Sequence, residues 1–202
     1  REILPEVVLQ GSGEDSPDTA DQKPQQVLAT SENLSPQLTA LRLLQGPSFE
    51  LAFAMLLRDV PNVEAICRRL KLSNDELERI AWLVRQQDAL RKPDKLSLAQ
   101  LKRLLAHPFC SDLLALMRAT LFAEHADLQP VLFCEQFLEA TPSEVLNPPP
   151  LVTGNDLIAL GLKPGPRFKQ LLDEVRDAQL NGEVVSHEAA MEWVRAKLDS
   201  RS

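Results

Sequence analysis

The chain has 202 residues, 44% of them hydrophobic, and its 29 acidic residues against 22 basic ones give a formal net charge of −7. This composition supports a real hydrophobic core in one large domain or two small ones. The acidic balance excludes a generally basic nucleic-acid-binding surface but allows a local basic patch. The apolar runs, such as residues 113–117, are too short to cross a membrane, so we expect a soluble cytoplasmic protein with no membrane partner.

The first part of the chain is not expected to fold by itself. Residues 1–10 are interpreted as the end of a helix, and residues 11–33 as a disordered linker rich in Gly, Ser, Pro and acidic residues. A Gly-Ser pair followed by acids in this linker resembles a nucleotidyltransferase signature and includes Ser12, Asp15 and Asp18. Two catalytic Mg²⁺ ions need carboxylates held side by side on a rigid strand, so we assign these three residues to solvated linker.

Residues 34–147 show helical periodicity without an alternating strand pattern, which predicts a helical body domain. The expected helices are 37–45, 48–59, 61–72, 74–90, 98–106, 112–126 and 130–140. The predicted N-caps are Ser35, Ser73, Ser97 and Ser111, and Glu76 completes a capping box with Ser73. The apolar face of the second helix is predicted to include Phe49, Ala52, Phe53, Leu56 and Leu57.

The triple proline at 148–150 is a stiff, extended spacer and the clearest internal boundary. Three shorter helices are expected after it, near 155–160, at 166–180 and at 187–198, and they would form a tail domain over residues 148–202. The predicted fold class is therefore all-α, with a helical bundle followed by a small helical tail.

The three cysteines give no sign of a metal or redox site. They are widely spaced, and each lies in an apolar helical pattern: Cys67, Cys110 and Cys134. We predict buried, reduced thiols.

Metal-dependent phosphohydrolase chemistry is not supported either. Arg58-Asp59 and Gln86-Gln87 stand where an HD-type hydrolase carries metal-binding histidines, and neither arginine nor glutamine replaces imidazole as a ligand. The remaining histidines, His107, His125 and His187, are scattered and are expected at helix ends or on the surface. A degraded phosphohydrolase is kept as a third alternative, which predicts Mn²⁺ or Ni²⁺ in the purified protein.

A concentration of positive charge surrounds the helix start at Pro166, where Lys163, Arg167 and Lys169 lie close together in the sequence. Free N–H groups at a helix start bind anions, most often phosphate, and basic side chains beside them strengthen the site. Gly165 is expected to adopt a backbone geometry closed to other residues. The alternative is a simple ion pair between Lys169 and Asp173 one turn later.

A second basic cluster lies near the end of the helix at 61–72 and consists of Arg68, Arg69 and Lys71. These cations either stabilise the helix C-terminus or contact phosphate, and the sequence leaves both interpretations open.

Residues 151–198 resemble the C-terminal tail of bacterial tRNA nucleotidyltransferases and poly(A) polymerases, the class II CCA-adding family. The resemblance rests on three motifs in order: Leu-x-Thr-Gly-x-Asp-Leu at 151–157, Gly-Leu-Lys-Pro-Gly-Pro at 161–166 and Gln-Leu-x-Gly-Glu-Val at 179–184. Residues 3–7 are similar to the end of the family's neck, and residues 48–59 and 68–86 to its body.

The resemblance implies a region that binds RNA without catalysing a reaction. The family's catalytic head, with its metal-binding aspartates, is expected before Arg1, so this chain alone should not transfer nucleotides and needs no cofactor. The full-length parent would use Mg²⁺ with ATP or CTP. The body and tail would hold the tRNA acceptor and T-arm, or another RNA, by the sugar-phosphate backbone. The expected phosphate contacts are Lys163, Gly165, Arg167 and Lys169, with Arg68, Arg69 and Lys71 as weaker candidates.

The main alternative is a helical scaffold that docks on a protein partner or forms a homodimer without binding RNA. The net negative charge and the low aromatic content of 4% support it, because few residues could stack on bases. The sequence does not distinguish CCA, partial CCA and poly(A) addition by the parent.

Overall fold

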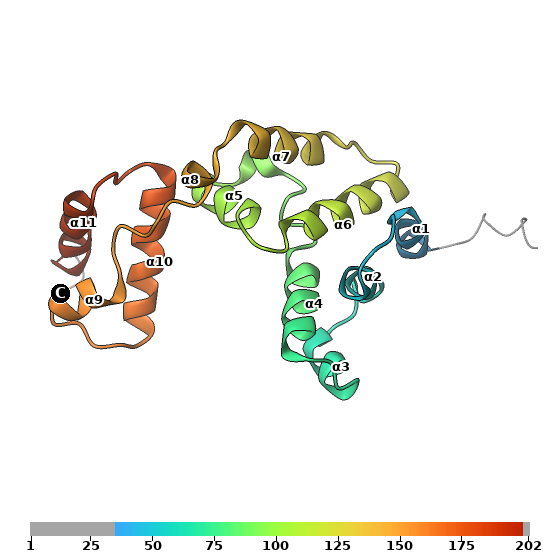
Figure 1. Ribbon diagram of the computed structural model, residues 1–202, viewed down its shortest axis with the longest axis horizontal. Coiled ribbons are helices and arrows are strands. Elements are labelled where there is room, and N and C mark those ends of the chain that lie inside the picture. The colour runs from blue at the N-terminus through green and yellow to red at the C-terminus, as the bar shows by residue number, and fades with distance from the viewer. Residues whose placement is uncertain (1–34, 200–202) are drawn as a thin grey trace, which may run out of the picture. The chain divides into compact units, whose positions relative to one another are not determined.

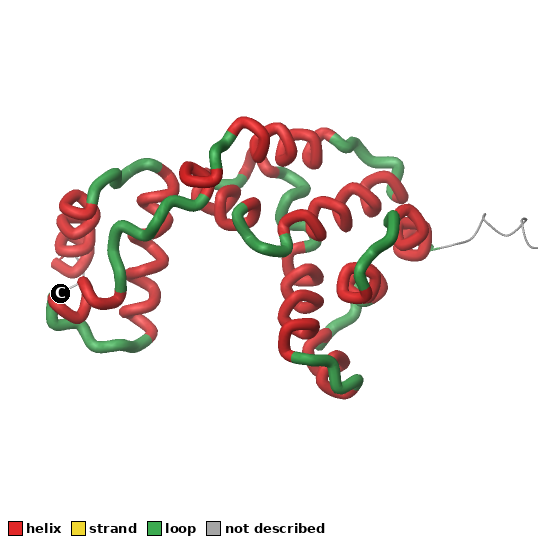
Figure 2. Tube along the Cα trace, viewed as in Figure 1, coloured by secondary structure: helices red, strands yellow, loops and turns green. Residues whose placement is uncertain are grey.

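The computed structural model describes residues 35–199, and within them every regular element is helical (Figures 1 and 2). The predicted all-α fold is confirmed for this part of the chain. The helix end expected at 1–10 and the linker expected at 11–33 lie outside the described residues. No helix of the described part is both long enough and apolar enough to span a bilayer.

The helices in the first part of the described chain agree with the predicted series, with two short additions, η1 and α8. They are α1 (Pro36–Leu43), α2 (Phe49–Leu56), α3 (Val63–Arg69), α4 (Asn74–Gln86), the 3₁₀ turn η1 (Pro93–Lys95), α5 (Leu98–Leu105), α6 (Cys110–Ala123), α7 (Gln129–Ala140) and α8 (Ser143–Leu146). Three further helices follow the prolines: α9 (Gly154–Ala159), α10 (Pro166–Asn181) and α11 (His187–Asp199).

Serine side chains cap the start of three helices as predicted. The Oγ atoms of Ser35, Ser73 and Ser97 accept backbone N–H groups of the first turns of α1, α4 and α5. The predicted cap at Ser111 is wrong, because α6 begins one residue earlier and its N-cap is Phe109. The Cys110 N–H donates to His107 O at 2.9 Å, so a tight turn after α5 starts the new helix before Ser111 is reached.

One hydrophobic core lies among α1 to α7, and its centre includes Met55, Ile80, Leu83, Leu113 and Met117. The predicted inward face of α2 is partly wrong. Leu51, Ala54 and Met55 are buried, whereas Phe49 is 51% and Leu56 is 44% exposed. Helix α2 has apolar residues on all its sides, so the periodicity of its sequence could not tell which side packs against α4 and α6.

A second hydrophobic core lies among α9, α10 and α11, where Leu157, Leu171, Val175, Ala190 and Val194 are buried. It is joined to the first by α10, which also packs along α5. Asn181 Oδ1 accepts the Ala99 N–H at 2.8 Å, and Arg103 Nε donates to Asp177 Oδ1 at 2.6 Å. Helix α10 therefore packs in the second core and also contacts α5, a helix of the first core.

The proline strap between the two cores, residues 148–150, is held to α10 by the side chain of Gln179. Gln179 Nε2 donates to Pro149 O at 2.8 Å, and its Oε1 accepts the Leu151 N–H at 3.2 Å. Because proline has no N–H to pair, the strap depends on such side-chain bonds for its position.

Candidate nucleic-acid interface

The first group of residues expected from the sequence to contact phosphate lies around the start of α10. Pro166 is the first helical residue, and the Lys169 N–H donates to Gly165 O at 3.1 Å. The N–H groups of Arg167 and Phe168 precede that bond and have no partner within residues 35–199. Unpaired amides at a helix start bring partial positive charge to the surface, so the backbone here suits an anion.

The side chains around this helix start are exposed and unpaired. Lys163, Gly165, Arg167 and Lys169 all lie at the surface, and the three cations form no ion pair with any described residue. The alternative pairing of Lys169 with Asp173 is not formed, since Asp173 Oδ1 lies 3.9 Å from Arg103 Nη1 instead. Phosphate binding at this cluster stays a prediction, supported by cations that no carboxylate neutralises.

The backbone geometry predicted for Gly165 is wrong, while its predicted contact with phosphate stays a prediction. Its φ of 171° and ψ of −175° describe extended backbone that any residue can adopt. The left-handed residue of this turn is Gly161, with φ of 82°, whose N–H donates to Ile158 O as α9 ends. Glycine is needed there because the left-handed region is strained for other residues.

The basic cluster at the end of α3 has a different character. Arg68 lies 3.9 Å from Glu64, which also binds Arg85 at 3.1 Å, so part of its charge is compensated. Lys71 has a left-handed backbone with φ of 58°, and its N–H donates to Arg68 O in a helix-ending turn. Arg69 is exposed. Figure 1 shows α3 standing apart from α10, so the two basic clusters do not form one patch.

Several residues of the three family motifs hold the fold of the tail together. Thr153 and Asp156 form the capping box of α9, and the Phe168 ring lies 3.5 Å from where a side chain on Gly154 would begin. Gln179 holds the proline strap, and Gly182 ends α10 with φ of 82°. The motifs therefore help to specify the tail's fold, and the middle motif also contains Lys163 and Gly165, two of the proposed phosphate contacts.

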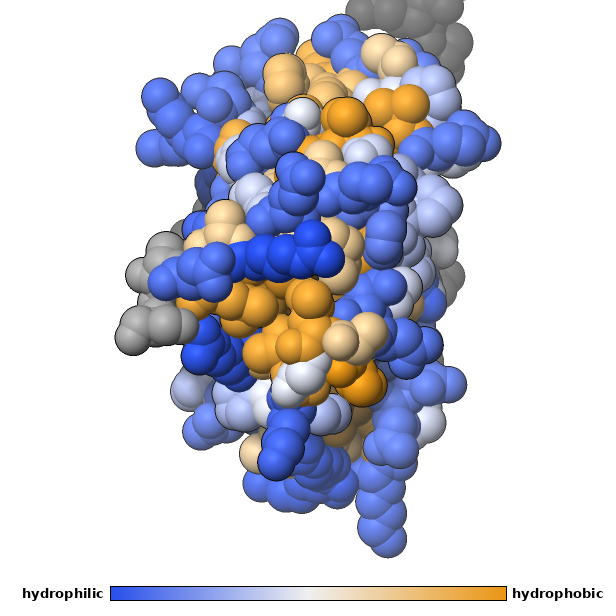
Figure 3. All heavy atoms as spheres, turned by 90° about the vertical axis from the view of Figure 1, so that its left-hand side faces the viewer, coloured by the Kyte–Doolittle hydropathy of each residue, from blue (hydrophilic) through white to orange (hydrophobic). Residues whose placement is uncertain are grey.

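Figure 3 shows the tail with the left side of Figure 1 turned toward the viewer, where apolar groups lie among hydrophilic ones. The most exposed large apolar residues of the tail are Val185 at 82% and Ile158 at 52%. The surface around the basic helix start is thus mixed in character and is not a uniformly basic face.

Arg58, which stands where an HD-type hydrolase carries a metal-binding histidine, belongs to an ion-pair network. Arg58 contacts Asp88 at 3.1 Å and Glu124 at 3.4 Å, and Arg91 contacts the same two carboxylates at 2.6 and 2.9 Å. The hydrogen bond from Arg91 lowers the pKa of Glu124 and raises that of Arg91 in turn. Residues 35–199 contain no group of three His, Cys, Asp or Glu side chains that could hold a metal ion.

The cysteines are buried and unpaired, as predicted. Burial raises the pKa of both Cys110 and Cys134 to about 11. Because the thiolate is the reactive form, these thiols are unreactive at neutral pH.

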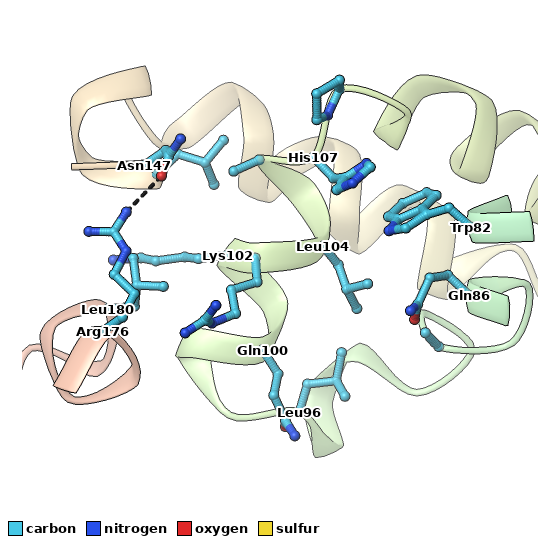
Figure 4. Close-up of a pocket in the computed structure, with 15 residues that line it drawn as sticks. Trp82, Gln86, Leu96, Gln100, Lys102, Leu104, His107, Asn147, Arg176 and Leu180 are labelled. Carbon is cyan, nitrogen blue, oxygen red and sulfur yellow. Dashed lines mark hydrogen bonds between the residues drawn. The ribbon is translucent and has the colours of Figure 1, made fainter. Parts of the chain in front are cut away.

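Sequence reasoning missed a cavity of about 650 Å³ that runs along α5 (Figure 4). The rings of Trp82 and His107 stack at its wall with centroids 3.9 Å apart and planes within 9°. Lys102, Arg103 and Arg176 also line it, and no carboxylate does. These side chains come from α4, α5 and α10, far apart in the sequence, so no short motif could have revealed the site.

Comparison with known proteins places the chain in a family. Residues 48–194, most of the chain, match the family described as tRNA nucleotidyltransferase domain 2. A similar protein is the A-adding tRNA nucleotidyltransferase of Deinococcus radiodurans, 31% identical over 140 residues, which cover 64% of this chain and 32% of that protein. The chain thus spans about a third of the length of this curated relative. No solved structure matches significantly. The chain belongs to the tRNA nucleotidyltransferase family and corresponds to its helical domain 2.

Proposed function

We propose that this chain is the RNA-binding region of a tRNA nucleotidyltransferase and does not itself catalyse nucleotide transfer. It would hold the acceptor and T-arm of tRNA by the sugar-phosphate backbone. The observation that carries the proposal is the start of α10, where unpaired amides lie beside exposed, unneutralised cations in a protein of this family. Contacts of this kind position an RNA without reading its sequence.

The proposal is tested by tRNA binding to the whole chain as a function of salt. Each phosphate contact contributes roughly 0.7 to 0.9 to the slope of log affinity against log salt. We expect Arg167→Glu/Lys169→Glu to weaken binding about tenfold or more and to lower that slope by about 2.

The matched control for this test is Arg42→Glu/Arg195→Glu, which makes the same change in net charge at exposed positions on α1 and α11. It should keep most of the affinity. Equal losses in the two double variants would mean that RNA responds only to net charge, and the absence of any salt-sensitive tRNA binding would refute the RNA-binding function.

We further propose that catalysis belongs to a preceding head domain of a cytoplasmic parent enzyme, which would use Mg²⁺ with ATP or CTP. Because the Deinococcus radiodurans relative is an A-adding enzyme, ATP is the first nucleotide to test. The chain alone should incorporate no labelled nucleotide into tRNA that lacks its 3′ adenosine. Incorporation above a no-enzyme control would place catalytic residues within these 202 residues.

A protein-docking or dimerisation role is the second candidate, favoured by the exposed apolar face of α2. Phe49 is 51%, Leu56 is 44% and Val60 is 36% exposed on or just after this helix. Light scattering of the chain with and without tRNA separates the two functions, because a scaffold would self-associate without RNA and would ignore its addition.

A further inference from the structure

We propose that the cavity along α5 binds one nucleotide unit, with its base against the Trp82–His107 pair and its phosphate against Lys102 and Arg176. The nucleotide could be free in solution or part of a single-stranded RNA. If the nucleotide belongs to an RNA, the site adds a base contact to the proposed RNA-binding function and rests on that function. The shared chemistry is a flat heteroaromatic ring joined to a phosphate.

The aromatic end of the cavity suits a base. Trp82 and His107 stack nearly parallel, and the Phe109 ring meets both edge-on at 5.9 and 5.1 Å, which fixes their orientation. The Phe109 N–H donates to His107 Nδ1 at 3.3 Å, and burial lowers the pKa of His107. The imidazole is therefore neutral near pH 7, and the pair is an uncharged aromatic wall of the kind on which bases stack.

The cationic end suits a phosphate, because two of its charges lack an anionic partner. Arg176 donates to two amide oxygens, Gln179 Oε1 at 2.8 Å and Asn147 Oδ1 at 2.7 Å, and meets no carboxylate within residues 35–199. Burial and the nearby charge of Arg103 lower the pKa of Arg176. Lys102 forms no ion pair with a described residue. A bound phosphate would supply the missing negative charge.

Arg103, the third cation of the lining, already forms hydrogen bonds between α5 and α10. Arg103 Nε donates to Asp177 at 2.6 Å, and its Nη2 donates to the Asp173 carbonyl at 3.1 Å. Arg103 is thus fixed in place and contributes charge at longer range, which leaves Lys102 and Arg176 as the direct contacts.

The size and layout of the cavity agree with a ligand of this class. Its volume of about 650 Å³ falls within the range of ligand pockets. Figure 4 shows the aromatic pair on one side of the view and Arg176 with Asn147 on the other, with side chains of α5 between them. Gln86, Gln100 and Asn147 supply amide groups along the lining, where donors and acceptors of a base or ribose could pair.

The test follows the indole N–H signal of Trp82 by NMR while AMP, adenosine or a four-nucleotide adenylate RNA is added to the whole chain. The chain has two tryptophans, so Trp193→Phe leaves one indole signal and identifies it. We expect AMP to shift this signal saturably, and adenosine to bind about tenfold more weakly because it lacks the charge-assisted contacts to phosphate. Saturation by AMP alone would assign the site to a free nucleotide, and saturation by the RNA would assign it to single-stranded RNA.

Two variants and a control test the phosphate contacts. Lys102→Gln breaks no described hydrogen bond and should weaken AMP binding severalfold, and Lys102→Gln/Arg176→Gln should weaken it at least about tenfold. Lys95→Gln removes an exposed cation outside the cavity and should leave binding unchanged. Equal binding by Lys102→Gln and Lys95→Gln, or no shift with AMP and the RNA, would overturn the proposal.

Failure of this site is distinguishable from failure of tRNA binding. Arg167 and Lys169 do not line the cavity, so their charge reversal should leave the AMP-induced shift intact. A chain that binds AMP and ignores tRNA would keep the cavity as a free-nucleotide site while removing the RNA-binding function.

Discussion

The side chain of Asn181 is predicted to be a principal link between α10 and α5. Its Oδ1 accepts the N–H of Ala99, a residue that is 1% exposed, at 2.8 Å. Replacing Asn181 with alanine leaves this buried donor without a partner and without access to water. An unpaired buried donor of this kind costs about 1–3 kcal/mol of unfolding free energy. For a chain of this size, each kcal/mol lowers Tm by roughly 2–4 °C.

The assay is denaturant unfolding followed by fluorescence, because Trp82 packs against the first core and Trp193 against the second. Asn181→Ala should lower the unfolding free energy by about 2 kcal/mol and speed hydrogen exchange at the Ala99 amide. Asn181→Asp keeps the acceptor for the Ala99 N–H but places a second carboxylate beside Glu183 at the C-terminal end of α10, so its stability should lie between those of the unaltered chain and Asn181→Ala.

The control for this prediction is Glu183→Ala, which removes only the exposed bond that Asn181 Nδ2 donates to Glu183 at 3.2 Å. It should change stability by less than about 0.5 kcal/mol. If Asn181→Ala unfolds within about 0.3 kcal/mol of the unaltered chain and the Ala99 amide stays protected, the linking role of Asn181 is refuted.

Two further predictions concern backbone strain and acid stability. Lys71 and Gly161 both have positive φ, which glycine adopts without strain and other residues do not. Lys71→Gly should therefore stabilise the chain by up to about 1 kcal/mol, and Gly161→Ala should destabilise it by about 1 kcal/mol or more. In thermal melts, Tm should rise for the first variant and fall for the second. Arg91 holds the pKa of Glu124 below its ordinary 4.5, so this carboxylate's stabilisation is complete above pH 4.5 and is lost as pH falls through the lowered value. Glu124→Gln should flatten the acid part of the stability curve, and a variant with unchanged acid dependence would contradict that assignment.

Local signals in the sequence were enough to place most helices. Ser73 with Glu76, and Ser97 before an amphipathic run, satisfy helix-start amides within a few residues, so no knowledge of the fold was needed to find α4 and α5. Ser111 failed because the turn at Pro108 and Phe109 starts α6 before a side-chain cap can form. That turn is closed by the bond from the Cys110 N–H to His107 O, which no capping pattern in the sequence indicates.

The inward side of α2 and the cavity depended on tertiary structure. Phe49 and Met55 belong to a helix whose residues other than Glu50 are all apolar, and only the positions of α4 and α6 decide which of them is buried. Trp82 and Arg176 are brought to one cavity by the docking of α10 on α5. No local pattern encodes that docking, whereas the exposed cations at the start of α10 could be predicted from sequence alone.

Because α10 is long, a small rotation where it contacts α5 produces a larger displacement at its basic start. Its polar contacts with α5 run from Asp173 to Asn181, and Arg167 is ten residues before Asp177, the middle of that range, about 15 Å away at 1.5 Å per residue. A pivot of about 10° at that contact would displace the basic end by about 2.6 Å over this length, close to the span of one hydrogen bond. The position of the basic helix start is therefore set by side chains in the other half of α10, where the helix is joined to α5.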